Sequence, residues 1–188
     1  MIFVTVGAQM PFDRMVQAVD DWAGKRGKND IFAQIGSTEF WPEHIQWTRF
    51  LDPPEFRKKL QAASVVVAHA GMGSIITALG LGKPILVMPR LGELGETRND
   101  HQVATAKRFL ELGCVSVAFD KKEMAKKLDK INDIKNGKMI GSHASPELLS
   151  TLRQFINQDI PLYMSSKWWN FILRRTLKQM SVTQVDRN

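Results

Sequence analysis

The chain has 188 residues, of which 44% are hydrophobic, and this suffices for one α/β domain with an extension. Its single cysteine, Cys114, excludes a disulfide framework within the chain and is typical of a protein from a reducing compartment. The opening residues lack the basic segment of a signal peptide, and no run of about 18 apolar residues predicts a membrane-spanning helix. We therefore expect a cytoplasmic protein.

The net charge of +7 is unevenly distributed along the chain. Residues 1–120 carry 13 basic and 13 acidic side chains, whereas residues 121–188 carry 13 basic and 6 acidic ones. The basic character therefore belongs to the tail. A basic tail can bind nucleic acid, but this one has no helix-turn-helix, zinc-binding or aromatic-strand signature, so we expect no nucleic-acid partner.

Predicted strands and helices alternate along the chain. Apolar runs predict strands at residues 1–6, 31–36, 45–51, 65–67 and 85–89. Helical spacing of apolar residues predicts helices from Pro11 until a break at Gly24, over 53–60, over 75–81 and after Gln102. This succession predicts an α/β fold with a doubly wound, mostly parallel, Rossmann-like sheet, in which ligands bind beyond the carboxyl ends of the strands.

The most informative stretch is a strand followed by a glycine turn and a helix. The β-branched run at 65–67 predicts a buried parallel strand, and Gly71 and Gly73 follow in a tight turn. Ser74 is placed to cap a helix that starts at Ile75. Backbone N–H groups at such a helix N-terminus favour an anion, and small residues let a phosphate approach the main chain. The stretch therefore predicts a diphosphate site.

Side chains at this turn strengthen the prediction, although the turn has an alternative explanation. His69 and Ser74 can add hydrogen bonds to a bound diphosphate. The turn lacks the third glycine of the dinucleotide fingerprint and the lysine of a P-loop, so neither of those motifs is present. The alternative is a Rossmann-type turn whose glycines serve packing alone, and a histidine between strand and turn favours the site over it.

Three segments are expected to meet at the carboxyl edge of the sheet: the loop 7–12, the turn 69–74 and the segment 90–102. The polar residues of the last segment are Arg90, Glu93, Glu96, Asn99, Asp100, His101 and Gln102. Together they can hydrogen-bond several hydroxyl groups of a ligand. The alternative is a solvated loop in which Asn99 or Asp100 caps the next helix.

Several ordered motifs resemble a known family. They are Thr5-Val6-Gly7, Pro11-Phe12-Asp13, His69-Ala70-Gly71-x-Gly73-Ser74, Gly82-Lys83-Pro84 and Asn99-x-His101-Gln102. With these motifs the chain resembles, over about residues 1–130, the carboxyl-terminal, donor-binding domain of family 28 glycosyltransferases. It is more similar to stand-alone donor-binding subunits of two-part enzymes, namely those of the dolichol-pathway N-acetylglucosaminyltransferase and of bacterial exopolysaccharide glycosyltransferases.

The resemblance implies one half of a two-domain GT-B fold and a site for a nucleotide-sugar donor. Among nucleotide sugars it implies a UDP-sugar. The binding residues that it implies are Gly7, Ala8, Gln9, His69, Gly71, Gly73, Ser74, Asn99, His101 and Gln102. Two acidic positions of the family are occupied differently here, by the apolar region 77–79 and by Val103-Ala104. Glu93 and Glu96 are the candidates to replace the missing acidic contact to ribose or sugar.

The chemistry of sugar transfer requires stabilisation of the leaving diphosphate and a base for the acceptor hydroxyl. The helix N-terminus can supply the first, and without an Asp-x-Asp pair in a suitable loop we expect neither a metal nor a cofactor. His69 and His101 are the candidate catalytic bases, although in the resembling enzymes the base and the acceptor often belong to the other half.

We therefore expect a membrane-anchored, acceptor-binding partner subunit and a lipid-linked acceptor. The predicted function is inverting sugar transfer in the biosynthesis of an exopolysaccharide or capsule. The alternative is a non-catalytic binding or regulatory subunit that stabilises a glycosyltransferase partner. A nicotinamide dehydrogenase is disfavoured because the dinucleotide fingerprint is incomplete.

Residues 161–180 predict a basic amphipathic helix with four basic residues and no acidic one. Its apolar face consists of Trp169, Ile172, Leu173, Thr176, Leu177 and Met180. Such a helix is too short and too charged to span a bilayer but suits an anionic membrane surface, and the alternative is that it packs on the sheet domain or the partner. We expect a nucleotide-sugar domain at 1–158, a helix and tail at 159–188, and a peripheral location at the cytoplasmic face of the membrane.

Overall fold

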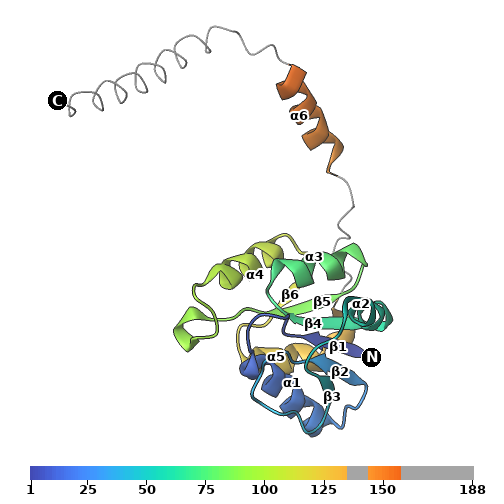
Figure 1. Ribbon diagram of the computed structural model, residues 1–188, viewed down its shortest axis with the longest axis vertical. Coiled ribbons are helices and arrows are strands. Elements are labelled where there is room, and N and C mark those ends of the chain that lie inside the picture. Colours follow the sequence, from blue (N-terminus) through green and yellow to red (C-terminus); the bar gives the residue numbers. More distant parts are fainter. Residues whose placement is uncertain (135–143, 158–188) are drawn as a thin grey trace, which may run out of the picture. The chain divides into compact units, whose positions relative to one another are not determined.

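A computed structural model of the protein describes residues 1–134 and 144–157 (Figure 1). The chain divides into two units, Met1–Ser142 and His143–Asn188. Helix α6 (Pro146–Asn157) belongs to the second unit, and the domain boundary expected after residue 158 stays a prediction. The helix expected at 161–180 lies outside the described residues. Within residues 1–134 and 144–157, no helix combines the length and hydropathy needed to cross a bilayer.

The first unit is built on a six-stranded sheet in which all neighbouring strands are parallel. The strands are β1 (Ile2–Thr5), β2 (Ile31–Gln34), β3 (Gln46–Thr48), β4 (Val65–His69), β5 (Ile85–Met88) and β6 (Ser116–Val117). Their order is β3-β2-β1-β4-β5-β6, so the chain winds outwards from β1 and then crosses over to β4 on its other side. This confirms the predicted doubly wound sheet and places its topological switch point between β1 and β4.

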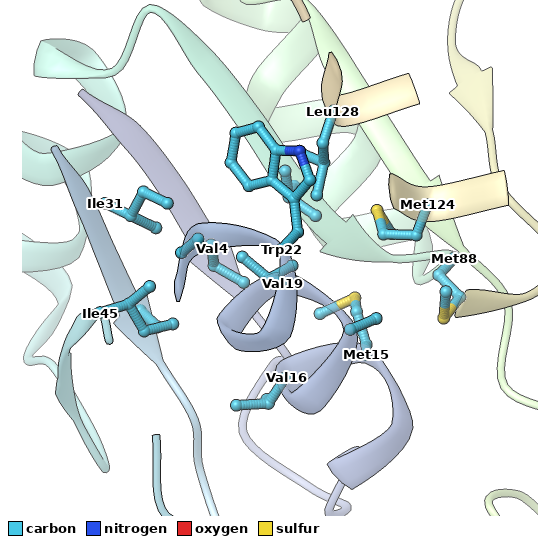
Figure 2. Close-up of a cluster of buried hydrophobic side chains, with 14 of the residues drawn as sticks. Val4, Met15, Val16, Val19, Trp22, Ile31, Ile45, Met88, Met124 and Leu128 are labelled. Atoms are coloured by element: carbon cyan, nitrogen blue, oxygen red, sulfur yellow. The ribbon is translucent and has the colours of Figure 1, made fainter. Parts of the chain in front are cut away.

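Helices cover both faces of the sheet (Figure 1). They are α1 (Asp13–Arg26), α2 (Pro53–Ala62), α3 (Met72–Gly80), α4 (His101–Glu111) and α5 (Lys121–Asp129), with short 3-10 turns at η1 (Gly92–Leu94) and η2 (Ile131–Asp133). Side chains of α1 and α5 pack on one face with Val4 and Met88, as Figure 2 shows, whereas those of α2, α3 and α4 pack on the other with Phe3. Because both faces are buried, the central strands are continuous apolar runs.

Two predicted helix boundaries were wrong. Helix α1 continues through Gly24 and ends at Gly27, whose φ of 60° is the left-handed conformation that terminates helices. A Cβ at Gly24 would lie only 2.6 Å from the ring of His44, so this glycine makes room for that ring inside the helix and does not form a turn. Helix α3 begins at Met72 with Gly71 as its N-cap, and Ser74 lies in the first turn without a capping hydrogen bond from its side chain.

Candidate functional site

A cavity of about 660 Å³ is lined by the ends of β1, β2 and β4 and by the segments that follow β1, β4 and β5. It therefore lies at the carboxyl edge of the sheet, at the switch point. Of the expected binding residues, the lining includes Gly7, Ala8, Gln9, His69, Gly71, Gly73, Ser74, His101 and Gln102. The three segments that were expected to converge do so here, although Glu93, Glu96 and Asn99 do not line the cavity.

His69 packs against two glycine backbones. A Cβ at Gly7 would lie 2.7 Å from Cε1 of His69, and a Cβ at Gly71 would overlap Nε2 of the same ring. Gly7 also has a φ of +79°, which side-chain-bearing residues rarely adopt. Gly73 differs, because a Cβ there would meet nothing within 4 Å. Packing thus explains Gly7 and Gly71, whereas Gly73 leaves open space at the cavity.

Two groups of backbone N–H donors meet at the cavity. One comes from the loop after β1, where the N–H groups of Ala8 and Gln9 have no acceptor within the described part of the chain. The other comes from the first turn of α3, where the N–H groups of Gly73 and Ser74 likewise find no acceptor among the described residues. Unpaired donors of this kind, together with the positive end of a helix dipole, favour a bound anion.

Arg90 places a buried positive charge at the same cavity. The residue is 3% exposed, and its guanidinium donates to main-chain carbonyl oxygens, including that of Val6 at 2.8 Å. The neighbouring carboxylate, Glu96, forms its ion pair with Arg14 at 2.7 Å instead. Burial lowers the pKa of Arg90 to about 10, against the opposing effect of Glu96, so the guanidinium stays charged at neutral pH. The cavity lining within the described residues contains no carboxylate, so its local charge is positive.

The environment of His69 determines its protonation state. Burial, followed by the positive charge of Arg90, lowers the pKa of His69 to about 4. The imidazole is therefore neutral at physiological pH and a weak base. Its Nδ1 is buried and has no hydrogen-bond partner among the described residues.

Gln34 is a second cavity residue with an unsatisfied polar atom. This residue of β2 is 5% exposed, and its Nε2 donates to the carbonyl oxygen of Gly7 at 3.4 Å. Its Oε1 has no partner within the part of the chain that the structure describes. A buried polar atom left unpaired is costly, so this atom and Nδ1 of His69 mark positions where a ligand or water forms a hydrogen bond. Oε1 of Gln34 accepts that bond, whereas Nδ1 of His69 donates or accepts according to the tautomer of the ring.

The structure gives the acidic candidates other surroundings. Both carboxylate oxygens of Glu96 accept hydrogen bonds from Arg14, and one also accepts from the N–H of Leu91 at 2.9 Å. Glu93 is exposed in η1, and Asn99 contacts Nδ1 of His101. Glu96 therefore shapes the segment after β5, and neither carboxylate is part of the cavity lining.

The polar segment after β5 also supplies the first turn of α4. This helix begins at His101, which is exposed and lines the cavity, and its N-cap is Asp100. The carboxylate of Asp100 accepts from the N–H of Gly92 at 2.8 Å, so it closes the segment instead of capping the helix with its side chain. Gln102 is buried, and its Oε1 accepts from the N–H of Arg90 at 3.2 Å.

Sequence reasoning missed several cavity residues. Thr5, Gln34, Thr77 and Thr97 line the cavity but were not among the expected binding residues, whereas Arg90, which also lines it, was expected only as one of the polar residues of its segment. The available signal was a polar residue at the carboxyl end of an apolar strand, which applies to Thr5 and Gln34, since these two are paired neighbours in β1 and β2. No comparable local signal singles out Arg90 from the other charged residues of its segment.

The sheet and its helices have the fold of one half of a GT-B glycosyltransferase, as predicted. The chain belongs to the glycosyltransferase family 28 C-terminal domain, whose family model matches residues 1–152. This confirms the family that the sequence motifs indicated.

Curated relatives and solved structures agree with this assignment. The chain is 34% identical over 122 residues to the UDP-N-acetylglucosamine transferase subunit ALG13 of Homo sapiens, covering 60% of this chain and 10% of that protein. Its counterpart in Mus musculus is 31% identical over 121 residues, covering 59% and 10%. The chain thus spans about a tenth of the length of these relatives.

Two solved structures illustrate the shared fold. The solution structure of ALG13 superposes with a TM-score of 0.53 at 20% identity, covering 76% of this chain and 90% of that one. Os79 from O. sativa in complex with UDP superposes with a TM-score of 0.54 at 16% identity, covering 70% of this chain and 31% of that one.

Proposed function

We propose that this chain is the donor-binding subunit of a two-part glycosyltransferase and that it binds a UDP-sugar in the cavity at the switch point. The observation that carries the proposal is the meeting of unpaired N–H donors with the charge of Arg90 in a lining without carboxylates. This combination is suited to a diphosphate. Family membership and similarity to a UDP-N-acetylglucosamine transferase subunit support a nucleotide sugar as its source.

In this proposal the diphosphate lies between the loop Gly7–Gln9 and the turn Gly71–Ser74. Negative charge develops on the leaving diphosphate during transfer, and fixed donors that already point at it stabilise that charge without reorganising. These groups come from the protein itself, so we retain the expectation of metal-independent transfer. The sugar and ribose lie towards His101 and Gln102. Asn99 contacts the ring of His101 and does not itself line the cavity.

The two candidate bases have different roles in the proposal. His69, with a pKa of about 4, is a poor proton acceptor from an acceptor hydroxyl, and we assign it a hydrogen-bonding role as a neutral ring. His101 is exposed and lines the cavity, so it fits the role of base better. The base can equally be supplied by the acceptor-binding half.

We further propose a membrane-anchored partner subunit that supplies the acceptor-binding half and a lipid-linked acceptor in exopolysaccharide or capsule biosynthesis. A GT-B site lies between two halves, and the cavity here belongs to one of them. The purified chain alone should therefore transfer sugar very poorly, and rapid turnover without a partner would contradict this. The alternative, a non-catalytic subunit that stabilises its partner, is supported by the two acidic positions of the family that are occupied here by residues 77–79 and Val103-Ala104.

Isothermal titration calorimetry of the full chain with UDP, GDP and NAD tests the donor site. The sharpest variant is Gly73→Asp, because a side chain at Gly73 meets open space and an acidic residue in a first helical turn does not destabilise the helix. Gly73→Asn is its matched neutral control. We expect UDP to bind the wild type and Gly73→Asn within about fivefold of each other, and Gly73→Asp to bind at least about tenfold more weakly through charge repulsion.

Each result decides a different part of the proposal. Equal UDP affinity of the aspartate and asparagine variants would remove the diphosphate from this turn. Preferential binding of GDP or NAD would refute the assigned donor. Failure of the wild type to bind UDP would favour the non-catalytic alternative.

A further inference from the structure

The guanidinium of Arg90 bonds to both ends of the loop that follows β1. Its Nη2 donates to the carbonyl oxygen of Val6 at 2.8 Å and to that of Met10 at 2.7 Å. Its Nε donates to the carbonyl oxygen of Pro11 at 3.3 Å. The planar group also lies 4.8 Å from the centre of the Phe12 ring. One side chain from the end of β5 thus contacts the residues before and after Gly7–Gln9.

The loop between these two anchor points has few other attachments. The N–H of Gly7 donates to Oγ1 of Thr5 at 3.2 Å, and its carbonyl oxygen accepts from Gln34 at 3.4 Å. Ala8 and Gln9 are exposed, and no hydrogen bond involves their N–H groups within the described residues. The conformation of the loop therefore depends on the contacts at its ends, of which the two from Nη2 of Arg90 are the shortest.

Arg90 is itself held from several sides. Its N–H donates to Oε1 of the buried Gln102 at 3.2 Å, and its side chain is almost fully buried. A lysine at this position would present one nitrogen, whereas these bonds use two nitrogens of a planar fork that also stacks on an aromatic ring. The contacts therefore require an arginine and are not satisfied by positive charge alone.

We propose that Arg90 is the positioning residue of the donor site, because its guanidinium fixes the loop Gly7–Met10 in the conformation that presents free N–H groups to the diphosphate. The proposal rests on the function proposed above and adds a residue that acts through the loop. The guanidinium forms no ion pair with a carboxylate among the described residues, so its charge also favours the anion. Arg90 thus contributes to diphosphate binding by holding the loop and by its positive charge, and substitutions can separate these two contributions.

The variants Arg90→Lys and Arg90→Met separate the hydrogen bonds of the guanidinium from its positive charge. Lysine keeps the charge but not the guanidinium, whereas methionine keeps neither the charge nor the guanidinium. Arg26→Met is the matched control, because Arg26 pairs with Asp129 between α1 and α5 and does not line the donor cavity. Two measurements on the full chain are needed: the ¹⁵N heteronuclear NOE of residues 7–10 without ligand, and the UDP affinity by calorimetry. Circular dichroism establishes that each variant is folded.

We expect both Arg90 variants to lower the NOE of residues 7–10 and Arg26→Met to leave it unchanged. The UDP affinity should fall about tenfold in Arg90→Lys and further in Arg90→Met. A lysine variant with wild-type loop rigidity and affinity would overturn the proposal, and so would a loop that stays rigid in Arg90→Met. If Arg90→Met does not fold, the lysine variant alone decides. If wild-type protein does not bind UDP, the proposed function fails, whereas the NOE still tests whether Arg90 fixes the loop.

Discussion

Gly71 and Gly73 allow a matched pair of alanine substitutions that tests the packing of His69. The backbone of Gly71 is extended, with φ of −87° and ψ of 137°, so alanine is free of backbone strain there, and the three atoms nearest to its Cβ belong to the imidazole of His69. Overpacking a tight contact of this kind costs about 1–3 kcal/mol of stability. At Gly73 a Cβ meets nothing within 4 Å, and alanine gains up to about 1 kcal/mol from its helix propensity. We therefore expect the two variants to differ by about 1–4 kcal/mol in their free energy of unfolding.

Urea unfolding followed by far-ultraviolet circular dichroism measures this difference, provided that the dependence on urea is the same in all variants. His69→Ala removes the ring that the new methyl group would meet. In the double variant Gly71→Ala/His69→Ala, the cost of the Gly71 substitution should therefore fall by at least about 1 kcal/mol in a double-mutant cycle. If Gly71→Ala is as stable as Gly73→Ala, or if removal of the ring brings no relief, the argument that His69 occupies this space is wrong.

Two further predictions concern pH and the tail. Burial and the charge of Arg90 lower the pKa of His69 from 6.5 to about 4, so between these pH values the unfolded chain binds a proton at His69 that the folded chain does not. The contribution of neutral His69 to the free energy of unfolding should therefore be fully present above pH 6.5 and be lost as the pH falls towards 4. His69→Gln should flatten that part of the pH profile of urea unfolding, and an unchanged slope would contradict the lowered pKa. The basic helix at 161–180 stays a prediction: the full chain should sediment with anionic but not neutral vesicles, and deletion of residues 161–188 should release it. Equal binding with and without the tail would exclude this role.

Five of the six strands were predictable because their signals are local, whereas the two-residue strand β6 was not predicted. Strands buried on both faces are apolar along their buried length, as in β5 with the sequence ILVM and in β4 with VVVA before His69 at its carboxyl end. Helix ends were less predictable where tertiary contacts override local preference. Gly24 reads as a helix breaker, yet the ring of His44 lies where its side chain would be. That ring is held by the buried carboxylate of Asp20, which accepts from Nδ1 of His44 at 3.1 Å, and no local pattern reveals this contact.

The cavity was predictable to the extent that topology determines it. Once β1 and β4 are parallel neighbours, the residues after Thr5 and His69 must lie at the same edge of the sheet. The ion pairs that the charged residues form could not be predicted from topology in this way. Glu96 stands in a polar segment and reads as a ligand, but its partner Arg14 comes from a helix that is remote in sequence. Which acid meets which base is decided by packing between elements.

The pairing of these charges determines the electrostatics of the proposed donor site. Arg14 and Arg90 both lie near the ring of Phe12, with guanidinium carbons 5.3 and 4.8 Å from its centre, so they share one neighbourhood. Both carboxylate oxygens of Glu96 accept hydrogen bonds from Arg14. The guanidinium of Arg90 donates instead to main-chain carbonyl oxygens, which carry no net charge. Had the carboxylate paired with Arg90 instead, the cavity would have lost its positive charge and the loop after β1 its anchor. The ion pair on Arg14 therefore serves the site indirectly, because it keeps an acid away from the guanidinium that the diphosphate is proposed to need.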